Sequence, residues 1–352
     1  MASNNLTPAQ RAQLFAQSTR QNLQMLPPQT ATGGAQTLQF NLPKARLLSN
    51  IMLRVEAQIS GSGTAWADTT PDYFTPFKLI RRISLDLNNG FSPYTIGGTE
   101  LALLNMVSVH GAQNMILCSK NDEAEQFDYV GISSDRTKMV CTLELPVTLN
   151  GKEPTGLILL QNAETNIQLT VDIANDNDIY DNKENVSVKV VSVKVTPLIE
   201  TFSIPSVQQA FPDLSVLKLC NSRTEGFLGN GQNIIKLTTG TIYRKLIFRV
   251  TDENGKPFED ADFTSNIDLV FNQADVNYSV NANALRIKNL CDGLVLLPGC
   301  FAFDFSSSGF LPNYGGTRDF IDTSLLTEFW LRFSSSKRGK ISIITEQIAR
   351  LK

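Results

Sequence analysis

The stretch NVSVKVVSVKVTP (185–197) alternates apolar and polar side chains with a period of two. Because successive side chains of a β-strand point to opposite faces of a sheet, this pattern predicts a half-buried strand. The phase of the alternation slips at Val190 and Val191, which predicts a β-bulge or a strand crossing between two sheets. Pro197 is predicted to end the strand.

Strands of the same kind are predicted throughout the chain from about Gln36 onward. The alternation is clearest in residues 83–87, 141–145 and 167–173. The body of the chain is therefore predicted to be all-β.

The order of these strand patterns is repeated in the second half of the chain. Five pairs of similar segments follow one another in the same order: IMLRV (51–55) and LIFRV (246–250), ISLDLNN (83–89) and IDLVFNQ (267–273), TLELP (142–146) and AFDFS (302–306), NIQLTVDI (166–173) and EFWLRFSS (328–335), SVKV and KISI. Each half also has a helix-like segment after the second pair, TELALLN (99–105) and NALRIKN (283–289). The period is too long for a solenoid repeat or a propeller blade, so it predicts duplication of a whole β domain.

These patterns predict two consecutive eight-stranded jelly rolls, a double jelly roll, preceded by an N-terminal helical arm. The predicted boundaries are 1–34 for a basic helical arm, 35–200 for the first jelly roll and 201–352 for the second. Strand pattern gives way to an irregular segment between Pro197 and Pro212, which places the boundary between the two domains.

Composition limits the possible functions. The 352 residues can bury a sizeable core without disulfides. The five cysteines form no CxxC pair, which fits a protein that is made in a cytosol and keeps its thiols reduced. The net charge of −3 lacks the basic excess of a dedicated nucleic-acid binder, so no sequence-specific nucleic-acid binding is expected. Neither a signal peptide nor a membrane-spanning segment is predicted.

The first residues differ from the rest in charge and pattern. Thr7 followed by Pro8 predicts the start of a helix, which is expected to run to Pro27–Pro28. No acidic residue occurs before Glu56, although several basic residues do. This arm is either a surface or oligomer-swapping tail, or a helix held against an anionic surface of lipid headgroups or packaged nucleic acid.

Two motifs connect this organisation to a known family. The opening LTPAQRAQL (6–14) and the segment LPVTLNGKEPTGLILLQNAETNIQLTVDIANDN (145–177) resemble the double jelly-roll major capsid proteins of tailless, internal-membrane phages of the tectivirus type. Together these motifs cover less than a fifth of the chain. The second jelly roll shares no motif with the family, so loop features of the family are not carried over.

The resemblance implies a structural role. It implies a homotrimer whose three chains supply six jelly rolls to a pseudo-hexagonal capsomer, with neighbouring capsomers tiling an icosahedral shell. Further implied partners are the internal viral membrane and the vertex (penton) and minor capsid proteins. The chain would be made in the host cytoplasm and located in the virion.

The resemblance also implies which residues face the membrane. The helix of the family faces inward, so Arg11 and Arg20 are expected near lipid headgroups. Leu14 and Phe15 are expected at the lipid boundary or packed on the base of the trimer.

Few residues offer catalytic chemistry. The chain has a single histidine, His110, which excludes a metal site with two imidazoles and is expected to be structural or exposed. Glu144 and Asp172 could form the carboxylate pair of a glycosidase, but both occupy the polar positions of alternating strands. No catalytic residue, metal ligand or cofactor is predicted, and the chain is not expected to be an enzyme.

Three predicted loops contain residues that could bind a ligand or a partner. Residues 172–185 are rich in oxygen ligands and could hold calcium, but they lack the spacing of an EF-hand, and a solvated loop is expected. The basic turn SSSKRGK (334–340) could touch phosphate, although a plain hairpin loop is simpler. The glycine-rich residues 309–320 are typical of a loop that makes intersubunit or outer-surface contacts.

Two other functions remain open. A jelly-roll receptor-binding or lectin-like spike protein would be expected to carry a shaft or repeat, and none is visible in the sequence. A carbohydrate-active enzyme would need aromatic side chains around its carboxylates, and the only tryptophans are Trp66 and Trp330.

Overall fold

The computed structural model describes residues 7–62, 74–87, 90–108, 137–149, 155–160, 167–179, 187–306 and 320–350. Packing divides the chain into two compact units. The first contains Met1–Gly98, Lys120–Lys218 and Ala349–Lys352, and the second contains Thr99–Ser119 and Leu219–Ile348. The division into an arm (1–34) and two jelly rolls (35–200 and 201–352) stays a prediction.

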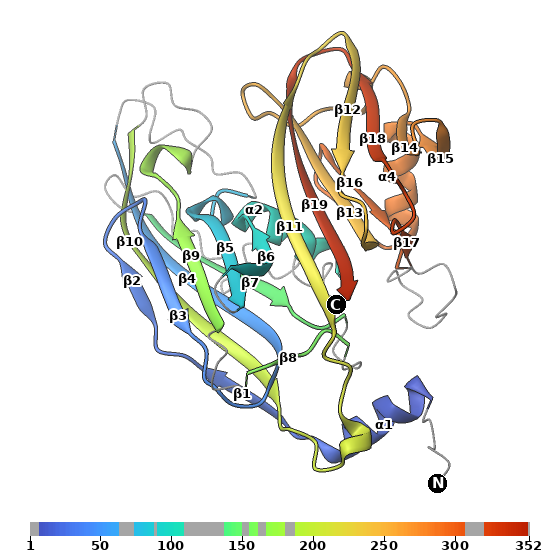
Figure 1. Ribbon diagram of the computed structural model, residues 1–352. Helices are drawn as coiled ribbons and strands as arrows, with labels where there is room; N and C mark the ends of the chain where they lie inside the picture. The colour runs from blue at the N-terminus through green and yellow to red at the C-terminus, as the bar shows by residue number, and fades with distance from the viewer. Residues whose placement is uncertain are drawn as a thin grey trace. The chain divides into compact units, whose positions relative to one another are not determined.

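The first unit contains two groups of antiparallel strands (Figure 1). Its strands are β1 (Gln21–Met25), β2 (Gln29–Ala31), β3 (Thr37–Asn41), β4 (Leu47–Ser62), β5 (Ile80–Leu87), β6 (Phe91–Ile96), β7 (Thr137–Pro146), β8 (Ile158–Leu159), β9 (Ile167–Ile173) and β10 (Ser187–Phe202). One group has the order β1-β10-β4-β7, with β2 also on β10 and β8 also on β4. The other has the order β3-β9-β5-β6.

The second unit repeats this arrangement. Its strands are β11 (Val216–Phe227), β12 (Gly231–Leu237), β13 (Ile242–Asp252), β14 (Ile267–Phe271), β15 (Asp275–Val280), β16 (Cys300–Asp304), β17 (Ile321–Asp322), β18 (Phe329–Ser335) and β19 (Gly339–Arg350). One group has the order β11-β19-β13-β16, with β17 also on β13, and the other has the order β12-β18-β14-β15.

The two strand orders can be superimposed element by element. The segments that resemble one another in sequence lie on β4 and β13, on β5 and β14, on β7 and β16, on β9 and β18, and on β10 and β19. Each pair occupies the same place in its own unit. The predicted duplication is therefore visible as two jelly rolls with one strand order.

Helices follow equivalent strands along the chain as well. The described helices are α1 (Pro8–Ser18), α2 (Gly98–Val107) and α4 (Ala282–Cys291), with short 3₁₀ turns η1 (Phe77–Leu79), η2 (Asp176–Asp178), η3 (Gln208–Ala210) and η4 (Asp260–Asp262). Helix α2 follows β6 and α4 follows β15, as the two helix-like segments predict. Glycine is required at the start of α2, because a Cβ on Gly98 would lie 2.3 Å from the carbonyl oxygen of Phe77. No helix in the described ranges combines the length and apolarity needed to span a bilayer.

The core of the second unit lies between its two groups of strands. Tyr243 and Phe248 on β13 and Phe301 on β16 join Leu269 on β14 and Phe333 on β18 in one buried cluster. Aromatic rings meet mainly edge to face in this cluster, an arrangement that ring quadrupoles favour. In the first unit, β4 and β9 bury alternate residues, as strands with one face on a core do.

Strand β10 confirms one prediction and corrects another. Its register with β4 shifts between Val190 and Ser192, so Val191 is the extra residue of a β-bulge at the predicted position. The prediction that Pro197 ends the strand is wrong, because β10 continues to Phe202. Pro197 lies opposite Leu53, and β10 continues beyond it because Leu198 to Phe202 pair with both β1 and β4.

Candidate functional site: the amino-terminal arm

Helix α1 begins as the sequence predicts. Thr7 caps it: the Gln10 amide N–H donates to Thr7 Oγ1 at 3.3 Å, and the Thr7 N–H donates to Gln10 Oε1 at 2.9 Å. This reciprocal pair is a capping box, with Gln10 in the position usually taken by glutamate. The first turn contains no acidic residue.

The helix ends far earlier than predicted. It stops at Ser18, Thr19 is extended, and the expected continuation to Pro27–Pro28 is wrong. Residues 21–25 instead form β1, which pairs antiparallel with the end of β10. Helix propensity is a weak preference, and here hydrogen bonding to a distant strand outweighs it.

Phe15 attaches α1 to the first unit. Only 4% of its surface is exposed, and it clusters with the fully buried Leu47 and with Leu157. Its ring meets that of Phe202 edge to face, with centroids 5.3 Å apart. Burial of a phenylalanine ring stabilises such a contact by about 2 kcal/mol, so the helix is fixed on the body of the protein.

A second contact places α1 along η3 and the segment that follows it. There the Ser215 hydroxyl and N–H donate to Asp213 Oδ1 at 2.6 and 3.0 Å, and they hold the pKa of Asp213 below its usual value. Arg350, whose guanidinium lies 3.4 Å from Asp213 Oδ2, and Arg11 lower that pKa further. Arg11 therefore has an ionised carboxylate in its neighbourhood.

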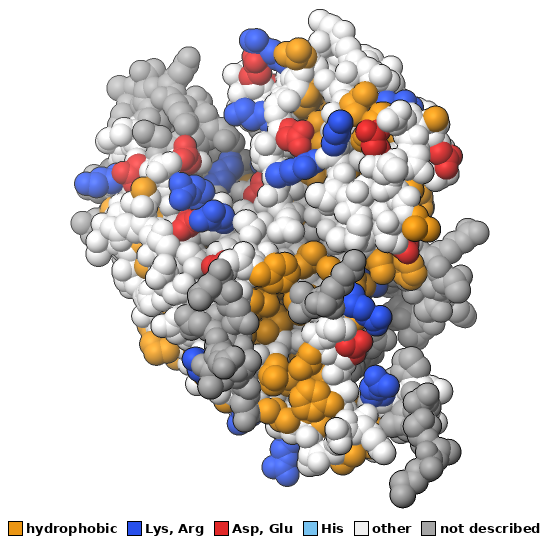
Figure 2. All heavy atoms as spheres, viewed as in Figure 1, with side chains coloured by type: hydrophobic (Ala, Val, Ile, Leu, Met, Phe, Trp, Pro, Cys, Tyr) orange, Lys and Arg blue, Asp and Glu red, His pale blue; other side chains and the backbone are white. Residues whose placement is uncertain are grey.

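The four residues predicted to face a membrane have different surroundings. Arg11 and Arg20 are exposed, Leu14 is half-buried and Phe15 is buried. At the lower end of the view in Figure 2, where Figure 1 places α1 and β1, hydrophobic side chains lie among isolated Lys and Arg side chains. The arm thus presents Arg11 on a helix whose largest apolar side chain is already used for attachment, and Arg20 between that helix and β1.

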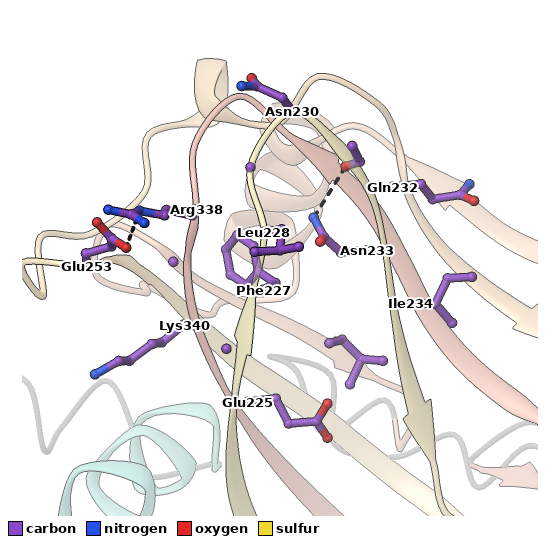
Figure 3. A pocket seen from close by; sticks show the side chains of 15 residues that line it. Glu225, Phe227, Leu228, Asn230, Gln232, Asn233, Ile234, Glu253, Arg338 and Lys340 are labelled. Atoms are coloured by element: carbon purple, nitrogen blue, oxygen red, sulfur yellow. Dashed lines mark hydrogen bonds and ion pairs between the residues drawn. The ribbon is translucent and has the colours of Figure 1, made fainter.

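A hollow in the second unit lies at the turn between β11 and β12 (Figure 3). Its volume is about 960 Å³, and it is open to solvent. Arg338 of the basic turn at 334–340 pairs there with Glu253, and Figure 3 shows Lys340 and Gln232 pointing to opposite sides. Because the polar side chains do not converge, the hollow has no arrangement suited to catalysis or to binding a small ligand.

The candidate carboxylates are not brought together. Glu144 on β7 accepts a hydrogen bond from Asn50 at 2.8 Å, whereas Asp172 is on β9, in the other group of strands. Asp172 is buried and is bound by Arg82 at 2.8 Å and by the Thr37 hydroxyl at 2.7 Å. It therefore anchors an ion pair, and neither residue is placed for glycoside hydrolysis.

Several predicted features lie outside the described residues. These are His110, Cys118, Trp66, residues 309–319 and residues 180–185 of the acidic loop. Across the ranges the structure does describe, no three His, Cys, Asp or Glu side chains gather as metal ligands would.

A buried ion pair in the second unit is not predicted from the sequence. Lys245 Nζ lies 3.2 Å from Asp304 Oδ2, and both side chains are almost inaccessible to solvent. On the other side of Lys245, Glu346 occupies the paired position on β19 and is also buried. A lysine within the apolar run of β13 is the signal that could have indicated this pair.

Comparison with known proteins agrees with this topology. No protein-family model matches the chain, and no curated protein matches its sequence. The major capsid protein of Sulfolobus turreted icosahedral virus superposes on it with a TM-score of 0.66 at 15% identity, covering 94% of this chain and 97% of that one. The fold is that of the double jelly-roll capsid proteins.

Two other double jelly-roll structures extend the comparison. The capsid protein of PBCV-1 virus has a TM-score of 0.67 at 8% identity, with 94% of each chain covered. The major capsid protein P2 of bacteriophage PM2 has a TM-score of 0.55 at 11% identity, covering 95% of this chain and 98% of that chain. At such low identities the likeness establishes the double jelly-roll fold.

Proposed function

We propose that this chain is the major capsid protein of an icosahedral, membrane-containing phage of the tectivirus type. The observation that carries the proposal is a fold likeness to a viral major capsid protein over 94% of this chain and 97% of that one. The likeness thus extends over both jelly rolls and is not confined to one of them. The opening motif at residues 6–14 supports the phage type.

Duplication of the jelly roll supports a homotrimer. Two domains with one strand order let three chains present six similar domains, so a threefold capsomer can occupy a pseudo-hexagonal place in a shell. Neighbouring capsomers and the vertex and minor capsid proteins are the further partners. The chain is made in the host cytoplasm, functions in the virion and catalyses no reaction.

The arm is the part of this protein that meets the internal membrane. Arg11 and Arg20 are exposed in a segment that lacks acidic residues before Glu56. Each basic side chain near an anionic leaflet contributes about 1 kcal/mol to membrane association. Leu14 follows Arg11 by three residues on α1, and Phe15 holds the helix to the jelly roll. The bilayer is therefore contacted weakly by many copies of the arm and not by one deeply inserted anchor.

Electron-microscope class averages of the purified protein test the capsid role. The expected particle is threefold with a hexagonal outline, and its mass by light scattering equals three chains. A monomer or an elongated particle would overturn the proposal and favour the receptor-binding or lectin-like spike.

Flotation with vesicles tests the role of the arm. The trimer is expected to float with phosphatidylglycerol-containing vesicles and not with phosphatidylcholine alone. Arg11→Glu should weaken flotation at least about tenfold, because an attractive charge is reversed in each of the three copies. The matched control reverses one exposed lysine of the second unit, Lys236→Glu. Equal flotation of both variants would remove the membrane role and leave the capsid role standing.

A further inference from the structure

Strand β1 has an open edge. It is the last strand in the order β1-β10-β4-β7, and no described strand pairs with its outer side. The Arg20 carbonyl accepts from Ser203 N–H at 2.9 Å, and Leu26 N–H donates to the Pro197 carbonyl at 2.8 Å. In an antiparallel pair the backbone groups of alternate residues point the same way, so those of Gln21, Leu23 and Met25 point outward.

The side chains of β1 are exposed as well. Leu23 is 58% exposed and Met25 is 65% exposed, and their spacing puts both on one face of the strand. Natural proteins usually protect an edge strand with lysine, proline or a bulge, because an open edge is a template for another strand. Residues 21–25 contain none of these.

Strand β15 has a matching edge in the second unit. It is the last strand in the order β12-β18-β14-β15, and most of its side chains are exposed. Val276 is 39% exposed and Tyr278 is 38% exposed, and Val280 follows on the same face. Figure 1 shows β15 at the side of its sheet.

The two edges are complementary in one orientation. Arg20 immediately precedes β1, and Asp275 begins β15. A parallel alignment that places Arg20 beside Asp275 also places Leu23 beside Tyr278 and puts the apolar side chains of both strands on one face. An antiparallel alignment would instead bring Asp275 to the end of β1 that carries the apolar Met25. Opposite charges side by side and apolar side chains on a shared face therefore favour the parallel arrangement.

We propose that β1 of one copy pairs in parallel with β15 of a second copy, with Leu23 beside Tyr278, and that this strand pairing closes the capsomer. The inference rests on the proposed homotrimer and names the surface by which its copies meet. Each chain offers both edges, so the contact is head to tail, and such contacts close into a ring when the rotation fits. Backbone hydrogen bonds supply affinity, and the flanking side chains supply register.

Disulfide trapping tests the register. In a Cys291→Ser background, Leu23→Cys is combined with Tyr278→Cys and the assembled protein is oxidised. Neighbouring strands lie about 4.8 Å apart, within the Cα separation that a disulfide tolerates. Non-reducing gels should show a ladder that ends at three chains. Gln21→Cys with Val276→Cys is the second pair of the same register, in case loss of the Tyr278 ring disturbs β15.

The controls separate this inference from the trimer itself. Asn22→Cys with Tyr278→Cys places the thiols on opposite faces and should give no ladder. Arg20→Asp should slow trapping about threefold, and adding Asp275→Arg should restore it, since an exposed ion pair contributes only a fraction of a kcal/mol. A trimer by mass that neither cysteine pair traps would overturn the strand pairing alone, whereas a monomer would overturn the trimer as well. Trapping by Leu23→Cys alone would show a β1–β1 contact in place of the proposed one.

Discussion

The Nζ atom of Lys245 lies 3.2 Å from Oδ2 of Asp304 across the β13–β16 pair, and both side chains are buried. The other oxygen of the Asp304 carboxylate, Oδ1, accepts hydrogen bonds from the N–H and the hydroxyl of Ser306 at 2.9 and 2.6 Å. Removing one charge from such a pair takes away the ion-pair partner of the other charge in a buried position. We therefore expect Asp304→Leu to lower the free energy of unfolding by about 3–5 kcal/mol in chemical denaturation.

Replacing both partners is the informative control. Lys245→Met with Asp304→Leu should recover most of the loss, since two apolar side chains pack without a desolvation cost. Asp292→Leu, which removes the carboxylate of the exposed pair with Lys288, should cost less than about 1 kcal/mol. Equal losses for the Asp304 and Asp292 variants would contradict the interpretation.

Asn289 joins α4 to β16. Its side-chain amide donates to the Ala302 carbonyl at 2.6 Å and accepts from the Ala302 N–H at 3.1 Å, and the residue is 2% exposed. Asn289→Ala would leave both backbone groups buried without partners, so a loss of about 3 kcal/mol is expected. Amide hydrogen exchange at Ala302 should rise in parallel. Asn283→Ala, on the exposed face of the same helix, should change neither quantity.

The bulge at Val191 sets which side chains of β10 face the core. Deleting Val191 would shift the residues on one side of it by one position and turn Lys194 inward in place of Val193. We expect the deletion variant to be insoluble or unfolded by circular dichroism. Val191→Ala keeps the phase and should stay folded, with a loss under about 1 kcal/mol.

Cysteine accessibility gives a prediction that depends on pH. Burial raises the pKa of the Cys300 thiol to about 12, with Arg249 opposing the shift. Only about one in 10⁴ of these thiols is ionised at pH 8, so Cys300 should resist iodoacetamide while the exposed Cys291 is alkylated. Peptide mass spectrometry of the native protein measures both, and rapid alkylation of Cys300 would refute its burial. Above pH 9 the unfolded thiol loses its proton before the folded one, so this group lowers stability between pH 9 and 12.

The ring of Phe15 can be tested as the attachment of α1. Phe15→Ala should cost about 3–4 kcal/mol of local stability, because a buried aromatic ring is lost. Amide exchange throughout α1 should then become fast, while exchange in β4 should not change. Leu14→Ala, one position away and half-buried, should leave the helix protected.

Local patterns predicted the strands of this protein well. The phase slip at Val190 and Val191 is visible in the sequence because alternation with a period of two shows which face of the sheet each side chain takes. The similar segments of the two halves predict equivalent strands for the same reason. A duplicated domain repeats its alternation in order, and the sheet topology confirms each pair.

Distant contacts explain what the sequence did not reveal. Residues 21–25 have good helix formers, yet they lie beside residues 198–202, and backbone pairing to that strand decides their conformation. The packing of Phe15 on Leu47 and Phe202 likewise depends on segments far along the chain. No local window contains these partners, so periodicity could not predict either feature.

The two prolines between β1 and β2 have a consequence for how far strand addition can run. Proline offers no N–H to a neighbouring strand, and Pro27 and Pro28 are both exposed at the end of β1. A partner that docks on β1 must therefore stop after about five residues and cannot extend along the sheet. The open edge of β1 is thus long enough to pair with one specific strand. It is too short to start the repeated strand addition that produces fibrils.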